Sequence, residues 1–140
     1  MRPLFYLAAL SIGFTGCKQS APVAPSADGL TGTWIEKSAR KDTIIFNLDQ
    51  TGSSSANTLL VNRGREINPA GYLAPKLGSG FYRYYLKGDT ISVYDMYAST
   101  IYYAPFYIEQ KGNELYLDNF FEVGFRHPAT ATRTLVRLTN

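Results

Sequence analysis

The sequence predicts an all-β domain: an eight-stranded antiparallel up-and-down barrel, with a β-sandwich as the alternative. Two observations predict it. Apolar and polar residues alternate in eight short runs, and Gly, Asn and Asp separate most of these runs. No helical spacing of apolar residues follows residue 30. Of the 140 residues, 45% are hydrophobic and 14% aromatic, which suits a single domain with one hydrophobic core.

The alternation gives each strand one apolar face. The expected strands cover residues 33–37, 42–48, 54–62, 80–87, 90–96, 100–110, 114–119 and 132–139. The side chains expected inside the barrel lie on the apolar faces and are Trp34, Phe46, Tyr82, Tyr84, Ile91, Val93, Phe106, Ile108, Leu115, Leu117, Val136 and Leu138. Closing eight strands into a barrel also removes the exposed sheet edges.

Turn residues support the same strand order. Gly88 and Gly112 each lie where a tight hairpin needs a positive φ angle, and each is followed by Asp or Asn. Pro105 lies within the expected strand 100–110 and cannot donate a ladder hydrogen bond, so a bulge or break is expected there.

Two connections are longer than the others. Residues 63–79 contain several glycines and prolines and are expected to form a long loop. Residues 120–131 contain Phe120, Phe121 and Phe125, which we expect to cover one end of the barrel. A hydrophobic plug is favoured over a ligand gate for these three phenylalanines.

The N-terminus has the pattern of a secretory signal. Arg2 precedes an apolar run at residues 4–14, which is too short to cross a bilayer as a helix. The residues Phe14-Thr15-Gly16-Cys17 resemble a bacterial lipobox. This resemblance implies cleavage before Cys17 and attachment of lipid to its sulfur, whereas the alternative is a plain secretory signal with an incidental cysteine.

The expected organisation is therefore a signal peptide at residues 1–16, a lipidated Cys17 with a flexible tether to residue 29, and a barrel over residues 30–140. Such a chain is held at the bacterial cell envelope through the lipid on Cys17. The following residue is Lys18 and not Asp, which favours the outer membrane by resemblance to the enterobacterial sorting rule.

The first expected strand carries a further resemblance. Gly32-Thr33-Trp34 resembles the Gly-x-Trp motif that opens lipocalin-type barrels. There the Trp closes the barrel floor against a basic residue of the last strand, a role that Arg133 or Arg137 would take here through a cation–π contact. With the lipobox, residues 30–140 resemble the small lipocalin-like lipoproteins of Bacteroidetes-type bacteria.

An eight-stranded barrel holds either its own side chains or one small ligand. A carrier of a small apolar ligand would line its cavity, expected beneath residues 63–79, with residues from the strands and the plug: Trp34, Phe46, Tyr82, Tyr84, Phe106, Phe120, Phe121 and Phe125. A structural or protein-docking envelope module would instead have a filled interior. Its contact surface would be an outer face that carries five tyrosines: Tyr85, Tyr94, Tyr97, Tyr103 and Tyr107. Ordinary pairing of side chains on neighbouring strands would also explain these tyrosines.

A third alternative is a protease inhibitor that uses residues 18–30 as its N-terminal inhibitory segment.

Composition argues against several other classes. One Cys and one His, His127, do not suffice for an internal disulfide or a zinc site. Removing residues 1–16 lowers the net charge from +3 to +2, and the charges are scattered, so no nucleic-acid partner is expected. Glu122 is the only acid near His127 in sequence, so we expect no enzyme, and no cofactor motif is present.

Overall fold

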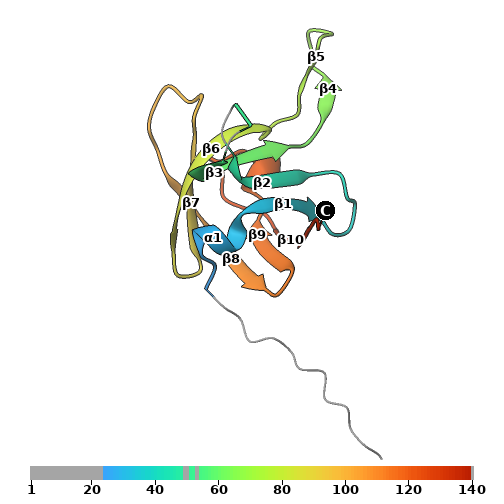
Figure 1. Cartoon of the computed structure of the whole chain (residues 1–140). Coiled ribbons are helices and arrows are strands. Elements are labelled where there is room, and N and C mark those ends of the chain that lie inside the picture. Colours follow the sequence, from blue (N-terminus) through green and yellow to red (C-terminus); the bar gives the residue numbers. More distant parts are fainter. Residues whose placement is uncertain (1–23, 49–50, 53, 140) are drawn as a thin grey trace, which may run out of the picture.

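The barrel predicted from the alternation is present. The computed structural model describes residues 24–48, 51–52 and 54–139. Its barrel strands are β1 (Gly32–Glu36), β2 (Thr43–Leu48), β3 (Ser54–Asn62), β6 (Gly80–Lys87), β7 (Thr90–Asp95), β8 (Ala104–Lys111), β9 (Glu114–Asp118) and β10 (Thr132–Arg137). They close in the order β1-β10-β9-β8-β7-β6-β3-β2, and every neighbouring pair is antiparallel (Figure 1). This confirms the up-and-down, lipocalin-like barrel over the β-sandwich.

The sixth barrel strand, β8, begins later than expected. It starts at Ala104, and Tyr102, which lies within the expected strand 100–110, precedes β8 and is 53% exposed. Neither the bulge nor the break expected at Pro105 occurs, because β8 runs without interruption from Ala104 to Lys111 and pairs with β7 in regular register. Pairing of β8 with β9 begins only at Ile108, so the missing N–H of Pro105 interrupts no ladder there.

The interior follows the predicted alternation except on β10. The predicted inward residues from Trp34 to Leu117 are all buried. On β10 the prediction was wrong by one residue: Leu135 is fully buried, whereas Val136 is half-buried and Leu138 lies 38% exposed beyond the strand end. Leu135 lies opposite Leu115, and directly opposite residues share a face of the sheet.

A short helix closes one end of the barrel. Ala27–Leu30, expected to include the end of the tether, form one helical turn, α1, with Ser26 as N-cap. The Leu30 side chain is fully buried in the core, and Pro25 is buried as well. The folded part of the chain therefore includes residues before 30, where the barrel domain was expected to begin.

A second short helix, α2 (Phe120–Val123), closes the other end, beside the long connection 63–79. That connection contains a hairpin in place of the expected loop. Its strands β4 (Arg65–Ile67) and β5 (Leu73–Pro75) pair only with each other and project from the barrel rim (Figure 1). We call residues 64–76 the arm.

Candidate functional site

The eight residues predicted to line an internal ligand site are all part of the barrel core. Phe46 and Tyr84 stack edge to face, with ring centroids 5.4 Å apart. At the α2 end, the ring centroid of Phe120 lies 5.2–5.5 Å from those of Tyr82, Phe106 and Phe121, and the ring centroids of Phe125 and Tyr82 are 6.2 Å apart. A molecule inside the barrel would have to displace these rings. The three phenylalanines of residues 120–131 thus pack as a hydrophobic plug.

The buried tyrosine hydroxyls find partners within the protein. The Tyr84 hydroxyl donates to Asn47 Oδ1 at 2.8 Å, and the Tyr82 hydroxyl donates to the Gly78 carbonyl oxygen at 2.9 Å. Burial raises the pKa of Tyr84 to about 12 and that of Tyr82 further still. Both hydroxyls therefore stay protonated at neutral pH, with their donor capacity used inside the protein.

Trp34 closes the α1 end of the barrel. Its indole Nε1 donates to the Leu30 carbonyl oxygen at 2.8 Å, and the Arg137 guanidinium lies 4.4 Å from its ring centroid. The basic residue expected over Trp34 is therefore Arg137. Arg133 instead forms a two-pronged ion pair with Glu122 at the opposite end, with both N–O distances 2.8 Å. Trp34 thus has a closing role in the fold.

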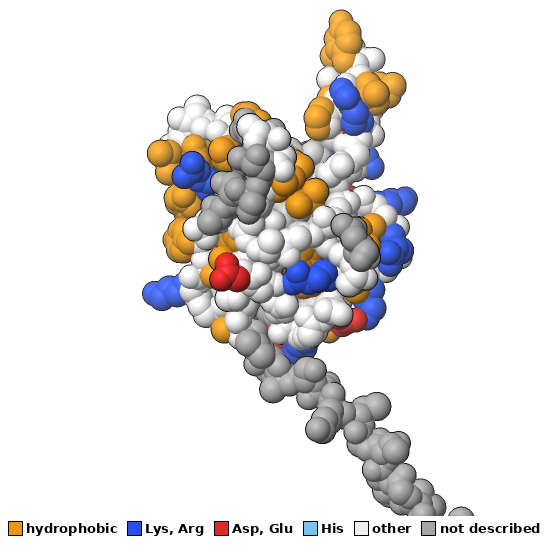
Figure 2. Space-filling model, in the orientation of Figure 1, with side chains coloured by type: hydrophobic (Ala, Val, Ile, Leu, Met, Phe, Trp, Pro, Cys, Tyr) orange, Lys and Arg blue, Asp and Glu red, His pale blue; other side chains and the backbone are white. Residues whose placement is uncertain are grey.

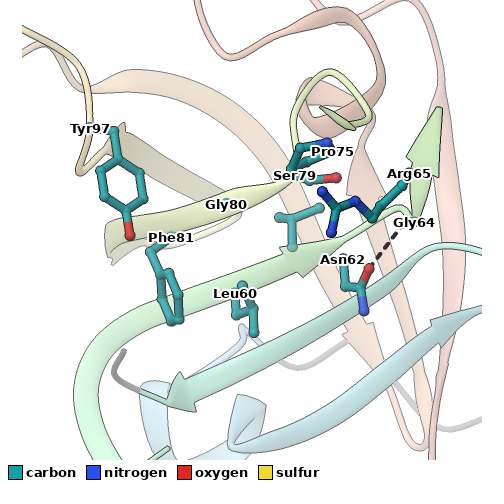
Figure 3. A pocket seen from close by; sticks show the side chains of 10 residues that line it. Leu60, Asn62, Gly64, Arg65, Pro75, Ser79, Gly80, Phe81 and Tyr97 are labelled. Carbon is teal, nitrogen blue, oxygen red and sulfur yellow. Dashed lines mark hydrogen bonds between the residues drawn. The ribbon is translucent and has the colours of Figure 1, made fainter. Parts of the chain in front are cut away.

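A groove of about 530 Å³ lies outside the barrel wall, at the base of the arm. It is lined by residues of β3, the arm, the start of β6 and the β7–β8 connection: Leu60, Val61, Asn62, Gly64, Arg65, Pro75, Ser79, Gly80, Phe81 and Tyr97. Figure 3 shows Arg65 entering from the arm and Tyr97 at the opposite side, with Leu60 and Phe81 between them. A cavity was expected beneath residues 63–79, and this groove occupies that position on the outer face.

The groove continues into an apolar face of the arm. Arg65 and Pro75 are paired across the hairpin, and so are Ile67 and Leu73, two residues further on. Because side chains alternate along a strand, these four residues share one face of the hairpin. Ile67 is 71% exposed and Leu73 57% exposed. Figure 2 shows hydrophobic side chains gathered at the projecting tip.

The arm is held at its base by Arg63. Its Nε atom donates to Asp42 Oδ2 at 3.1 Å, and its Nη1 atom donates to the carbonyl oxygens of Leu77 and Phe121 at 2.8 and 3.1 Å. Gly78, with φ +80°, packs so closely on α2 that a Cβ atom there would lie 1.9 Å from the Phe121 carbonyl oxygen. The arm and the plug therefore share one closely packed junction.

The outer tyrosines lie partly together. Tyr103 contacts Tyr85 and Tyr94 on neighbouring strands, with ring centroids 5.1 and 5.5 Å apart. Tyr97 lies at the groove, and Tyr107 is on β8. The predicted external tyrosine set therefore divides into a cross-strand cluster, one groove residue and one separate residue.

Among the described residues, no hydrogen bond joins His127 to Glu122. His127 is exposed. Glu122 accepts hydrogen bonds from Arg133 and Asn119. These bonds lower the pKa of Glu122, and the bond from Arg133 has the largest effect. Over residues 24–48, 51–52 and 54–139, no three His, Cys, Asp or Glu side chains group as a metal site. Within the same part of the chain, no helix has the length and apolarity needed to cross a membrane.

Cys17, the predicted lipidation site, lies outside the described residues, as does the predicted signal peptide. Comparison with protein-family models, curated proteins and solved structures finds no match to this chain.

Proposed function

We propose that this chain is a lipid-anchored, non-catalytic protein of the bacterial cell envelope that docks a protein partner through its arm. The observation that carries the proposal is the contrast between a filled barrel and an exposed apolar projection. Ile67, Tyr72 and Leu73 are each more than half exposed, although water disfavours such a cluster. Contiguous exposed apolar surface is typical of protein contact sites.

The positions of the two ends support this proposal. The chain enters the barrel through α1, and the arm leaves the rim at the opposite end (Figure 1). Ala24 lies seven positions after Cys17, so even a fully extended connection spans at most about 25 Å. A chain anchored at Cys17 therefore keeps α1 near the membrane, whereas the arm lies at the end of the barrel farther from the anchor.

The anchor is tested by Cys17→Ser in the full-length chain expressed in its own bacterium. We expect the variant to lose incorporation of labelled palmitate and to move from the membrane fraction to the soluble fraction, or to accumulate as precursor. Ser20→Ala, three residues later, is the matched control and should behave as the parent. Unchanged membrane attachment of Cys17→Ser would refute lipidation. The outer-membrane assignment is tested by separating the two membranes of the parent.

Docking is tested by a photo-crosslinking amino acid at Tyr72, with Tyr107 on β8 as the control position. We expect a discrete crosslinked species from Tyr72 alone, and its loss when Ile67 and Leu73 are both changed to Ser. Both residues are exposed, so the double variant should keep the parent's unfolding curve. If Tyr72 gives no discrete species, or the double variant leaves it unchanged, the arm is not the docking element.

A further inference from the structure

We infer that the groove at the base of the arm binds a small amphipathic carboxylate, a molecule with one apolar body and one carboxylate group. No residue of this groove belongs to the internal ligand set predicted from the sequence. Its volume of about 530 Å³ lies in the usual range of small-molecule sites, roughly 300–1,000 Å³. The inference is separate from the docking proposal, since it needs no protein partner.

The floor of the groove suits the apolar body. Leu60 and Phe81 are cross-strand partners on β3 and β6, and they face outward because their neighbours Leu59 and Tyr82 face the core. Pro75 adds an apolar wall from the arm, and Tyr97, 68% exposed, stands opposite (Figure 3). An apolar chain laid between these side chains would remove their surfaces from water together with its own.

Arg65 suits the carboxylate. It is the only charged side chain among the residues that line the groove, and Figure 3 shows its guanidinium directed into it. One of its N–H groups donates to the Leu73 carbonyl oxygen at 3.0 Å, and its other donors make no hydrogen bond with a described residue. A guanidinium has five N–H donors, so a two-pronged bond to a carboxylate remains available.

Two other arginines at this end of the barrel are paired with carboxylates, whereas Arg40 and Arg126, also at this end, form no ion pair with a described residue. Arg63 is paired with Asp42, and Arg133 is paired with Glu122. Arg65 has no ion pair with any acidic side chain that the structure describes. Its neighbour Glu66 is on the opposite face of β4 by alternation, so it does not supply the missing carboxylate to the groove.

Two polar side chains at the mouth of the groove accept hydrogen bonds from the backbone amides just before Arg65. Asn62 Oδ1 accepts from the Gly64 amide at 3.0 Å, and Ser79 Oγ accepts from the Arg63 amide at 3.2 Å. These two side chains are thus engaged with backbone on either side of the groove. The charged group that the groove offers a ligand is therefore the Arg65 guanidinium, beside apolar surface.

The test titrates the isotopically labelled mature chain with decanoate, below the concentration at which decanoate forms micelles, and follows backbone amide signals by NMR. We expect saturable shifts centred on Leu60, Phe81 and Tyr97, with a submillimolar Kd. Decanol, which has the same chain without the charge, should bind at least tenfold more weakly. Arg65→Gln should weaken decanoate binding at least tenfold, whereas Arg40→Gln, an exposed arginine outside the groove, should leave it unchanged.

Several outcomes would overturn the inference. Shifts that do not saturate would show no site, and equal binding of decanol would show that the carboxylate is not recognised. Unchanged affinity in Arg65→Gln would remove Arg65 from the site. Shifts centred on Tyr82 and Phe120 would place the ligand inside the barrel. The titration uses purified protein alone, so its failure and a failure of partner docking are independent results.

Discussion

Replacing Gly78 by Ala tests whether the arm and the plug share a junction. An Ala Cβ atom would lie 1.9 Å from the Phe121 carbonyl oxygen and 2.6 Å from its carbonyl carbon, so backbone would have to move. Such overpacking costs about 1–3 kcal/mol. The φ angle of +80° adds about 1 kcal/mol for a residue with a Cβ atom. The expected loss in the free energy of unfolding is therefore about 2–4 kcal/mol.

Gly71→Ala is the matched control. Gly71 lies in the turn of the arm with φ +86°, but a Cβ atom there would meet nothing within 4 Å. This variant should lose only the conformational part, about 1 kcal/mol. Urea unfolding followed by Trp34 fluorescence measures both variants, and in thermal unfolding Gly78→Ala should lower Tm by roughly 10–20 °C. Equal losses in the two variants would refute the close contact between Gly78 and α2.

Two further predictions concern polar groups in and near the core. The Arg133 bond lowers the pKa of Glu122 in the folded chain, so this pair stabilises above the unfolded pKa of about 4.3 and loses its effect as the pH falls through the lower folded pKa. Glu122→Gln should therefore cost about 1 kcal/mol at pH 7 and progressively less in acid, and a difference that does not vary with pH in urea unfolding would contradict this. Tyr84→Phe should lower the free energy of unfolding by about 1–2 kcal/mol, because it removes the buried hydrogen bond to Asn47. The control Tyr85→Phe, at an exposed position, should lower it by less than about 0.5 kcal/mol. Equal effects of the two variants would argue against the Tyr84–Asn47 bond.

The barrel could be predicted because burial of one face imposes a period of two on every strand. On β6, Tyr82 and Tyr84 face the core, whereas Arg83 and Tyr85 face water. Tyrosine alone suits either side, and it is the charged neighbour that indicates the register. A period of two can be recognised in strands of five or more residues with one plainly apolar face, which most of the barrel strands provide.

On β10 the period of two predicted the wrong inner face, for a physical reason. Val136 and Leu138 are more apolar than Arg133 and Arg137, yet the arginine face is the inner one. Each guanidinium lies at an end of the barrel, where it meets Glu122 or the ring of Trp34. These partners come from α2 and from β1, so no local pattern along β10 reveals them.

The sequence predicted a cavity beneath residues 63–79 but not an external groove, because the lining residues at 60–65, 75–81 and Tyr97 are brought together only by the hairpin and the closed barrel. The arm strands have three residues each, too few for an alternation to be recognised. A signal for the hairpin was present in Asn68-Pro69-Ala70-Gly71: the Asn68 side-chain oxygen accepts from the amides of Ala70 and Tyr72, as Asn commonly does in turns. Its position against Phe81 and Tyr97 depends on the closed barrel.

The residues that decide where the groove lies are therefore not the ones that line it. A two-stranded hairpin has little stability of its own in water, and most of the arm's apolar side chains are exposed. Its direction depends on the contacts at its base, where Arg63 reaches the carbonyl oxygens of Leu77 and Phe121 and Gly78 packs on α2. Phe121 in turn is fixed by burial in the barrel core. A change in the plug would consequently move Arg65 relative to Phe81, so loss of binding in such a variant would reflect the position of the arm and not its chemistry.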